Sequence, residues 1–185
     1  MVRTRAIACA IAVLAGAAPA SAHAATTPGC AGAGTVVVDE ATRQAAATTL
    51  LCLVNHERRI RQRSALRAST QLATAAAQQS TEMVADKYFS HDSPISGSLR
   101  ERVERTGYMG RRTSTLIGET LAWGAGEFAT PHQMVAAFLE SPVHRRTMLN
   151  KSFREVGVGI ALGAPVANVA MAAATATMDF GGRRR

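Results

Sequence analysis

The chain of 185 residues is long enough for one domain with a hydrophobic core, and we expect no second domain. Its formal net charge is +8 at pH 7, yet the basic runs carry no interleaved aromatic residues, which argues against nucleic-acid binding. No apolar run after the N-terminal segment is long enough to cross a bilayer, so we expect no membrane span.

Residues 1–24 have the form of a secretory signal peptide. Arg3 and Arg5 give a positive start, and an apolar stretch too short to span a bilayer follows. Both 20–22 and 22–24 fit a small-residue cleavage site, and cleavage at the second leaves 161 residues (185 − 24). We therefore expect a secreted, extracellular protein, with an uncleaved anchor as the alternative.

Two cysteines, Cys30 and Cys52, remain after cleavage. Because exported proteins mature in an oxidising compartment, this pair predicts one disulfide. The bridge would tie an extended lead-in, residues 25–44, to the first helix, and would contribute roughly 3 kcal/mol through chain entropy. It would also leave no free thiol to act as a nucleophile.

The periodicity of apolar residues predicts three helices in the first half of the mature chain. They span residues 41–62, 70–88 and 98–106. Ser69 is a suitable N-cap for the second helix, and Gly107 is a suitable C-cap for the third.

Strands dominate the second half. We predict strands over residues 116–123 and 155–162 and a last strand that ends at Phe180, joined as an antiparallel sheet. Between them, Thr130 and Gln133 have the spacing of a capping box, with Pro131 at the first helical position, so a helix starts there. Helices first and strands later, with helices also between strands, indicate an α+β fold.

Two histidines and a glutamate are the candidate site residues. His91 follows the second predicted helix, where a histidine is commonly just a hydrogen-bonded helix end. Ser141 and Pro142 place His144 at the third position of a helix, whose positive end disfavours imidazolium. Neutral imidazole binds metal or accepts a proton, although His144 could also simply complete the cap.

Glu119 lies within an otherwise apolar strand, and a carboxylate there needs a partner or an open cleft. The structural alternative to a functional role is an ion pair, for example with Arg145 or Arg146. Together, two imidazoles and a carboxylate are the usual components of a metal site or of an acid/base site.

Basic residues gather in two places, residues 58–67 and 183–185. On an exported protein they could bind anionic cell-wall polymer or lipid headgroups. The alternative is a solvated helix face and a frayed tail.

Three motifs resemble one known family: Tyr-Phe-Ser-His at 88–91, Gly-Glu-Thr-Leu-Ala at 118–122 and Ser-Pro-Val-His-Arg at 141–145. The chain is similar to the bacterial branch of the CAP superfamily, also called SCP/PR-1-like, over nearly all of the mature sequence. We place this CAP domain at residues 45–182. The resemblance implies a three-layer α-β-α sandwich with a central antiparallel sheet.

The resemblance also implies a cavity lined by two histidines and one or two glutamates, which binds a divalent cation in some members. His91, Glu119 and His144 match three of those positions, so they are the expected metal ligands, for Zn²⁺ or another divalent cation. Ser141 stands at the fourth position, and Glu140, one residue away, is either an exposed helix end or a further cavity residue. Thr120 replaces the usual Asn beside the cavity.

We therefore expect a monomeric, non-catalytic binding module that takes an apolar or cell-envelope ligand. The alternative is a metal-assisted extracellular hydrolase, directed at peptides or the cell wall, with Glu119 as its general base.

Overall fold

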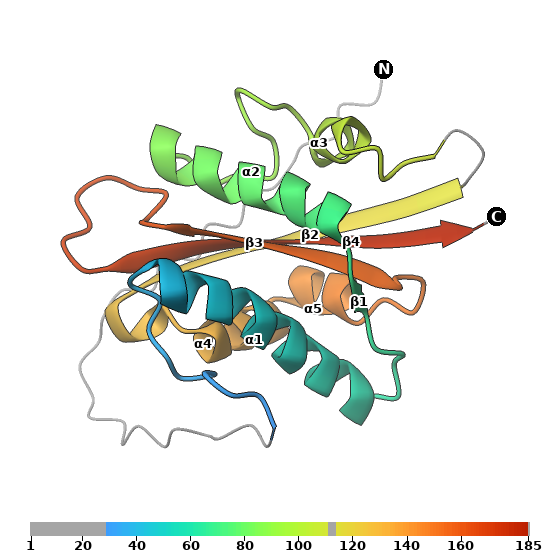
Figure 1. Ribbon diagram of the computed structural model, residues 1–185, viewed down its shortest axis with the longest axis horizontal. Coiled ribbons are helices and arrows are strands. Elements are labelled where there is room, and N and C mark those ends of the chain that lie inside the picture. Colours follow the sequence, from blue (N-terminus) through green and yellow to red (C-terminus); the bar gives the residue numbers. More distant parts are fainter. Residues whose placement is uncertain (1–28, 111–113, 185) are drawn as a thin grey trace.

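The computed structural model describes residues 29–110 and 114–184, so the predicted signal peptide lies outside the described residues. A central sheet separates two helical layers, with α2 and α3 on one face and α1, α4 and α5 on the other (Figure 1). In chain order the elements are α1 (Glu40–Ile60), β1 (Arg67–Ala68), α2 (Thr70–Asp86), α3 (Leu99–Arg105), β2 (Ser114–Ala125), the 3-10 turn η1 (Gly126–Phe128), α4 (Pro131–Glu140), α5 (Pro142–Met148), β3 (Glu155–Leu162) and β4 (Ala173–Arg184).

This architecture confirms the predicted α+β sandwich. The sheet has the order β1-β3-β4-β2, and its three long strands are antiparallel, as predicted. The short strand β1 differs, because it pairs parallel to the start of β3 and makes the sheet mixed. A strand of two residues has no periodicity that a sequence pattern could reveal.

Capping residues set the start of each long helix. Asp39 forms a capping box with Thr42 and starts α1 at Glu40, so the last residues of the predicted lead-in, 40–44, belong to the helix. Ser69 caps α2 as predicted, and Thr130 caps α4 with Pro131 in its first turn. The predicted helices are thus found, with ends shifted by one or two residues.

The disulfide between Cys30 and Cys52 is present, with its Cα atoms 5.7 Å apart. It joins the segment before α1 to the middle of that helix, as the sequence predicted. Among the described residues, no helix is both long and apolar enough to cross a membrane.

The larger hydrophobic core lies between the sheet and the α1, α4 and α5 layer. Its fully buried members include Leu50, Phe138, Met178 and Phe180. Burying a side chain of this size contributes about 1.5–3 kcal/mol. A smaller cluster around Leu72 fills the other side of the sheet, below α2 and α3.

Two glycines of β3 allow α2 to lie directly on the strand. A Cβ atom on Gly157 would lie 2.0 Å from the backbone nitrogen of Ala73, and one on Gly159 would lie 2.2 Å from the carbonyl carbon of Ala76. Both distances are far inside van der Waals contact. Helix backbone and strand backbone therefore touch here with no side chain between them.

The outer edge of β3 is paired with β1 only at Glu155 and Val156. Beyond that point an open hollow of about 520 Å³ follows the edge, between α1 and α2. The guanidinium of Arg43 donates to the carbonyl of Ile160 across this hollow, at 3.3 Å.

Candidate functional site

The carboxylate of Glu119 is the centre of the candidate site. Its side chain, on β2, is 2% exposed, and both of its oxygens are bonded. Oε1 lies 2.7 Å from Nδ1 of His91, and Oε2 accepts a hydrogen bond from Nη2 of Arg102 at 2.5 Å. Glu119 is therefore a buried carboxylate held between an imidazole and a guanidinium.

Arg102, from α3, is the partner that sequence reasoning missed. The side chain is fully buried, and its Nη1 donates to the carbonyls of Gly97 at 2.7 Å and His91 at 3.1 Å. The expected alternatives, Arg145 and Arg146, are exposed on α5 instead. A signal did exist: Arg102 follows Leu99 by three residues, on the inward side of the helix.

Asp179 is a second buried carboxyl group at this site. It lies directly opposite Glu119 in the antiparallel register of β2 and β4, and it is fully buried. Burial raises its pKa well above the ordinary value, and the charge of Glu119 raises it further. Among the described residues neither oxygen of Asp179 has a hydrogen-bond partner. The raised pKa favours the neutral form of Asp179, and Glu119 is the carboxylate that contacts Arg102.

His144 lies at the start of α5. Ser141 is the N-cap of this helix, and its hydroxyl accepts a hydrogen bond from the backbone N–H of His144, as the sequence predicted. The imidazole packs edge-on against Phe138, with ring centroids 5.7 Å apart. Burial lowers the pKa of His144, and the neighbouring His91 lowers it further. The predicted preference for neutral imidazole holds, but burial is its main cause.

The imidazoles of His91 and His144 lie next to each other, although His91 follows α2 on one side of the sheet and His144 belongs to α5 on the other. Their ring centroids are 6.4 Å apart with the planes at 69°, and the side chain of His91 is 54% exposed. The structure thus places His91 beside both Glu119 and His144.

The expected three-ligand metal set does not fit this arrangement. Both oxygens of Glu119 are already bonded to His91 and Arg102. Among the described residues, no group of three or more His, Cys, Asp or Glu side chains is placed to hold a metal ion. The two imidazoles still have nitrogens that Glu119 does not bind, and cation binding at this site stays a prediction.

The remaining predicted cavity residues have other positions. Thr120 is fully buried, and strand alternation turns its side chain to the face of β2 opposite that of Glu119. Ser141 caps α5, and Glu140 is an exposed residue at the end of α4. Neither Thr120 nor Glu140 takes part in the contacts described for the His91–Glu119 pair.

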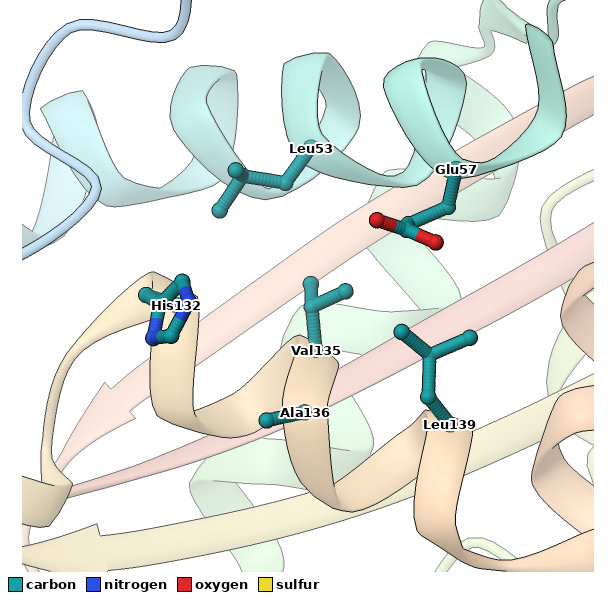
Figure 2. Close-up of a pocket in the computed structure, with 6 residues that line it drawn as sticks. All are labelled: Leu53, Glu57, His132, Val135, Ala136 and Leu139. Atoms are coloured by element: carbon teal, nitrogen blue, oxygen red, sulfur yellow. The ribbon is translucent and has the colours of Figure 1, made fainter. Parts of the chain in front are cut away.

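Two hollows lie away from this site. One of about 80 Å³ opens between α1 and α4 (Figure 2) and is lined by Leu53, Glu57, His132, Val135, Ala136 and Leu139. It is smaller than the ~150 Å³ that holds a benzene molecule, so we assign it no ligand. The wider hollow follows β3, at the opposite edge of the sheet from His91 and Glu119.

Known proteins are similar to this chain in sequence and in fold. Residues 51–173 match the model of the CAP family, described as the cysteine-rich secretory protein family. The uncharacterized protein YkwD of Bacillus subtilis is 32% identical over 107 residues, which cover 58% of this chain and 39% of that protein.

Two solved structures are similar. An extracellular SCP-domain protein of Bacillus anthracis is 28% identical, with a TM-score of 0.60 over 75% of this chain and 41% of that one. An outer surface protein of Borrelia burgdorferi is 16% identical, with a TM-score of 0.62 over 80% of this chain and 100% of that one, which shows a shared fold alone. This chain spans about two fifths of the length of both Bacillus proteins. The family match covers well over half of the chain, and the chain therefore belongs to the CAP family of cysteine-rich secretory proteins.

Proposed function

We propose that this protein is a secreted, non-catalytic binding module whose His91–His144 site holds a divalent cation. Its ligand, in this proposal, is an apolar or cell-envelope component that meets the site from the solvent side. Secretion is supported by the signal-like leader, by the disulfide and by the descriptions of the Bacillus anthracis and Borrelia proteins.

One observation carries the choice of binding over catalysis. A general base must have an oxygen free to accept a proton from water. Glu119 is 2% exposed, and Arg102 and His91 occupy both of its oxygens. It is therefore suited to orient other groups and poorly suited to activate water.

The same contact supports a revised role for Glu119 in cation binding. Metal-ligating histidines commonly present one nitrogen to the metal and donate the other N–H to a carboxylate, which fixes the tautomer and the ring orientation. Glu119 would bind Nδ1–H of His91 and leave Nε2 to the cation. His144, whose pKa is lowered by burial, would supply the second nitrogen. Such a cation would attract an anionic or carbonyl group of the ligand.

Zinc binding by the mature protein tests this proposal. Isothermal titration at pH 7 should give one site for the wild type and none for the His91→Ala/His144→Ala double variant. His132→Ala removes a histidine of α4 outside the site and should bind like the wild type. Equal zinc uptake by the wild type and the double variant would refute the cation site.

A hydrolase remains the second candidate, favoured by one feature of the site. A buried carboxylate hydrogen-bonded to one ring nitrogen of an exposed histidine can orient that histidine as a general base. The base would then be His91 and not Glu119. Turnover of a peptide or cell-wall substrate that His91→Ala abolishes, while the variant keeps its fold, would replace the binding proposal with this one.

A further inference from the structure

Two acid-free basic segments occur in the sequence. Residues 58–67 contain five arginines, and residues 145–154 contain three arginines and one lysine. Neither segment contains a single Asp or Glu. They thus hold nine of the 21 basic residues of the chain, although they are far apart in sequence.

The fold brings these two segments together at one end of the molecule. The buried guanidinium of Arg58 donates to the carbonyl of Ser64 in the first segment and to those of Met148, Asn150 and Phe153 in the second. The backbone N–H of Arg67 also donates to the carbonyl of Arg154, at 2.9 Å. Figure 1 shows this end, where the last turns of α1, strand β1 and helix α5 meet. We call it the basic end.

Most cations of the basic end have no carboxylate partner. Its exposed basic side chains are Arg59, Arg61, Arg67, Arg145, Arg146, Lys151 and Arg154. Among the described residues, only two of these seven form ion pairs: Arg61 with Glu57, and Arg67 with Glu155 at 4.0 Å.

Exposed arginines elsewhere in the described chain are more often paired. Arg100 pairs with Glu104, and Arg183 pairs with Glu155. Arg105 donates to the backbone carbonyl of Ser96 instead. The excess of positive charge is therefore concentrated at the basic end.

Local contacts account for only part of this concentration: Arg145 donates to the carbonyl of Leu139, and Arg154 donates to those of Lys151 and Phe153. Arg59 and Arg145 lie near helix C-termini, where a cation is favourable by about 0.3–1 kcal/mol. Lys151 and Arg154 lie outside any helix, and the charges of Arg154 and Arg63 act on the buried Arg58 as an additional destabilising influence. A surface that keeps mutually repelling cations together without acids is suited to an anionic partner.

The chemistry of the basic end selects among anionic partners. Guanidinium groups pair with phosphate through two parallel hydrogen bonds. With the part-exposed Arg63, the basic end has eight accessible cations, and all of them except Lys151 are arginines. The one aromatic residue of the two segments, Phe153, is buried, so no base can stack on it. Only Ile60 is an exposed large apolar side chain in these segments, too little to insert into a bilayer.

We propose that the basic end binds a linear, non-nucleic polymer that carries repeated phosphate groups. Such a polymer can contact several of these cations at once, and each contact releases a condensed counterion. This inference rests on residues other than His91 and His144, although Arg145 and Arg146 share α5 with His144, and it does not depend on cation binding there.

Binding of fluorescently labelled long-chain inorganic polyphosphate to the mature full-length protein tests the proposal. The Arg59→Gln/Arg146→Gln/Lys151→Gln triple variant should weaken binding about tenfold or more and reduce its salt dependence. The matched control, Lys87→Gln/Arg100→Gln/Arg105→Gln, removes the same charge from exposed positions of the α2–α3 layer and should bind like the wild type.

Three results would overturn the proposal. Equal weakening by the two triple variants would mean that net charge alone drives binding. Tighter binding to vesicles rich in anionic lipid than to polyphosphate would assign the surface to a membrane. Tighter binding to single-stranded DNA would assign it to nucleic acid.

Discussion

Two buried arginines, Arg58 on α1 and Arg102 on α3, are satisfied by different kinds of partner. Both are fully buried. Arg58 donates only to backbone carbonyls, whereas Arg102 donates to two carbonyls and to the carboxylate of Glu119. Burial, followed by the charges of Arg154 and Arg63, lowers the pKa of Arg58 to about 10.

The difference separates two uses of a guanidinium inside a protein. Arg58 joins chain segments through four donated hydrogen bonds, and no carboxylate among the described residues pairs with its charge. Arg102 neutralises Glu119 and also holds the carbonyl of His91, so it links the charge of the site to its geometry. Substitutions at the two arginines should therefore differ in size and in what restores stability.

The largest effect is expected for Arg102→Met. It leaves Glu119 as an uncompensated buried charge, and breaking a buried ion pair in this way costs about 3–5 kcal/mol. Urea unfolding would measure the loss, with Arg100→Met on the exposed side of the same helix as a control that should change stability by less than about 1 kcal/mol. Adding Glu119→Gln to Arg102→Met should recover part of the loss. A double variant less stable than Arg102→Met would contradict the proposed ion pair.

A smaller loss, about 1–3 kcal/mol, is expected for Arg58→Met. The substitution leaves carbonyls without a donor but also removes a charge that was costly to bury. The adjacent exposed residue provides the control, Arg59→Met, which should change stability by about 0.5 kcal/mol or less. A loss of stability as large as that of Arg102→Met would show that the carbonyl partners of Arg58 stabilise the fold as much as the carboxylate partner of Arg102 does.

The smallest effect is expected for Asp179→Asn. The raised pKa favours the neutral carboxyl, and an amide has nearly the same shape, so stability should change by about 1 kcal/mol or less at pH 5. A carboxyl whose pKa is raised by folding binds more protons when folded, so its contribution to stability falls as the pH rises above the unfolded-state pKa of about 4. The variant lacks this loss of stability, so its free energy of unfolding should rise relative to that of the wild type between pH 5 and pH 8.

Urea midpoints at the two pH values measure this difference, with Asp86→Asn as an exposed control. An advantage of Asp179→Asn that stayed constant or shrank with pH would mean that Asp179 is ionised in the fold. Glu119 would then share Arg102 with a second charge.

Much of the fold could be predicted from the sequence because its signals are local. Helix starts were predicted from the N-cap residues Ser69, Thr130 and Ser141. Strand β3 was predicted with its observed bounds. The pairing of Cys30 with Cys52 followed from the count of cysteines left in the mature chain.

The partners of Glu119 could not be predicted in the same way. Arg102 precedes it by 17 residues and Asp179 follows it by 60 (179 − 119), so only the sheet register and the docking of α3 bring them together. The two candidate partners nearest to His144 in sequence, Arg145 and Arg146, lie on the exposed side of a short helix. Local patterns identify charged residues in apolar surroundings, whereas tertiary packing decides which of them meet.

The two glycines of β3 have a consequence for the site, although neither lies near it in sequence. Gly157 and Gly159 determine how closely α2 approaches the sheet, and the segment that ends in His91 continues from that helix. Any side chain at either glycine would have to lift the helix away from the strand. The distance between the His91 imidazole and the Glu119 carboxylate therefore depends on the height of α2 above the sheet. The lack of side chains at two positions of β3 therefore helps to set the length of the His91–Glu119 hydrogen bond at β2.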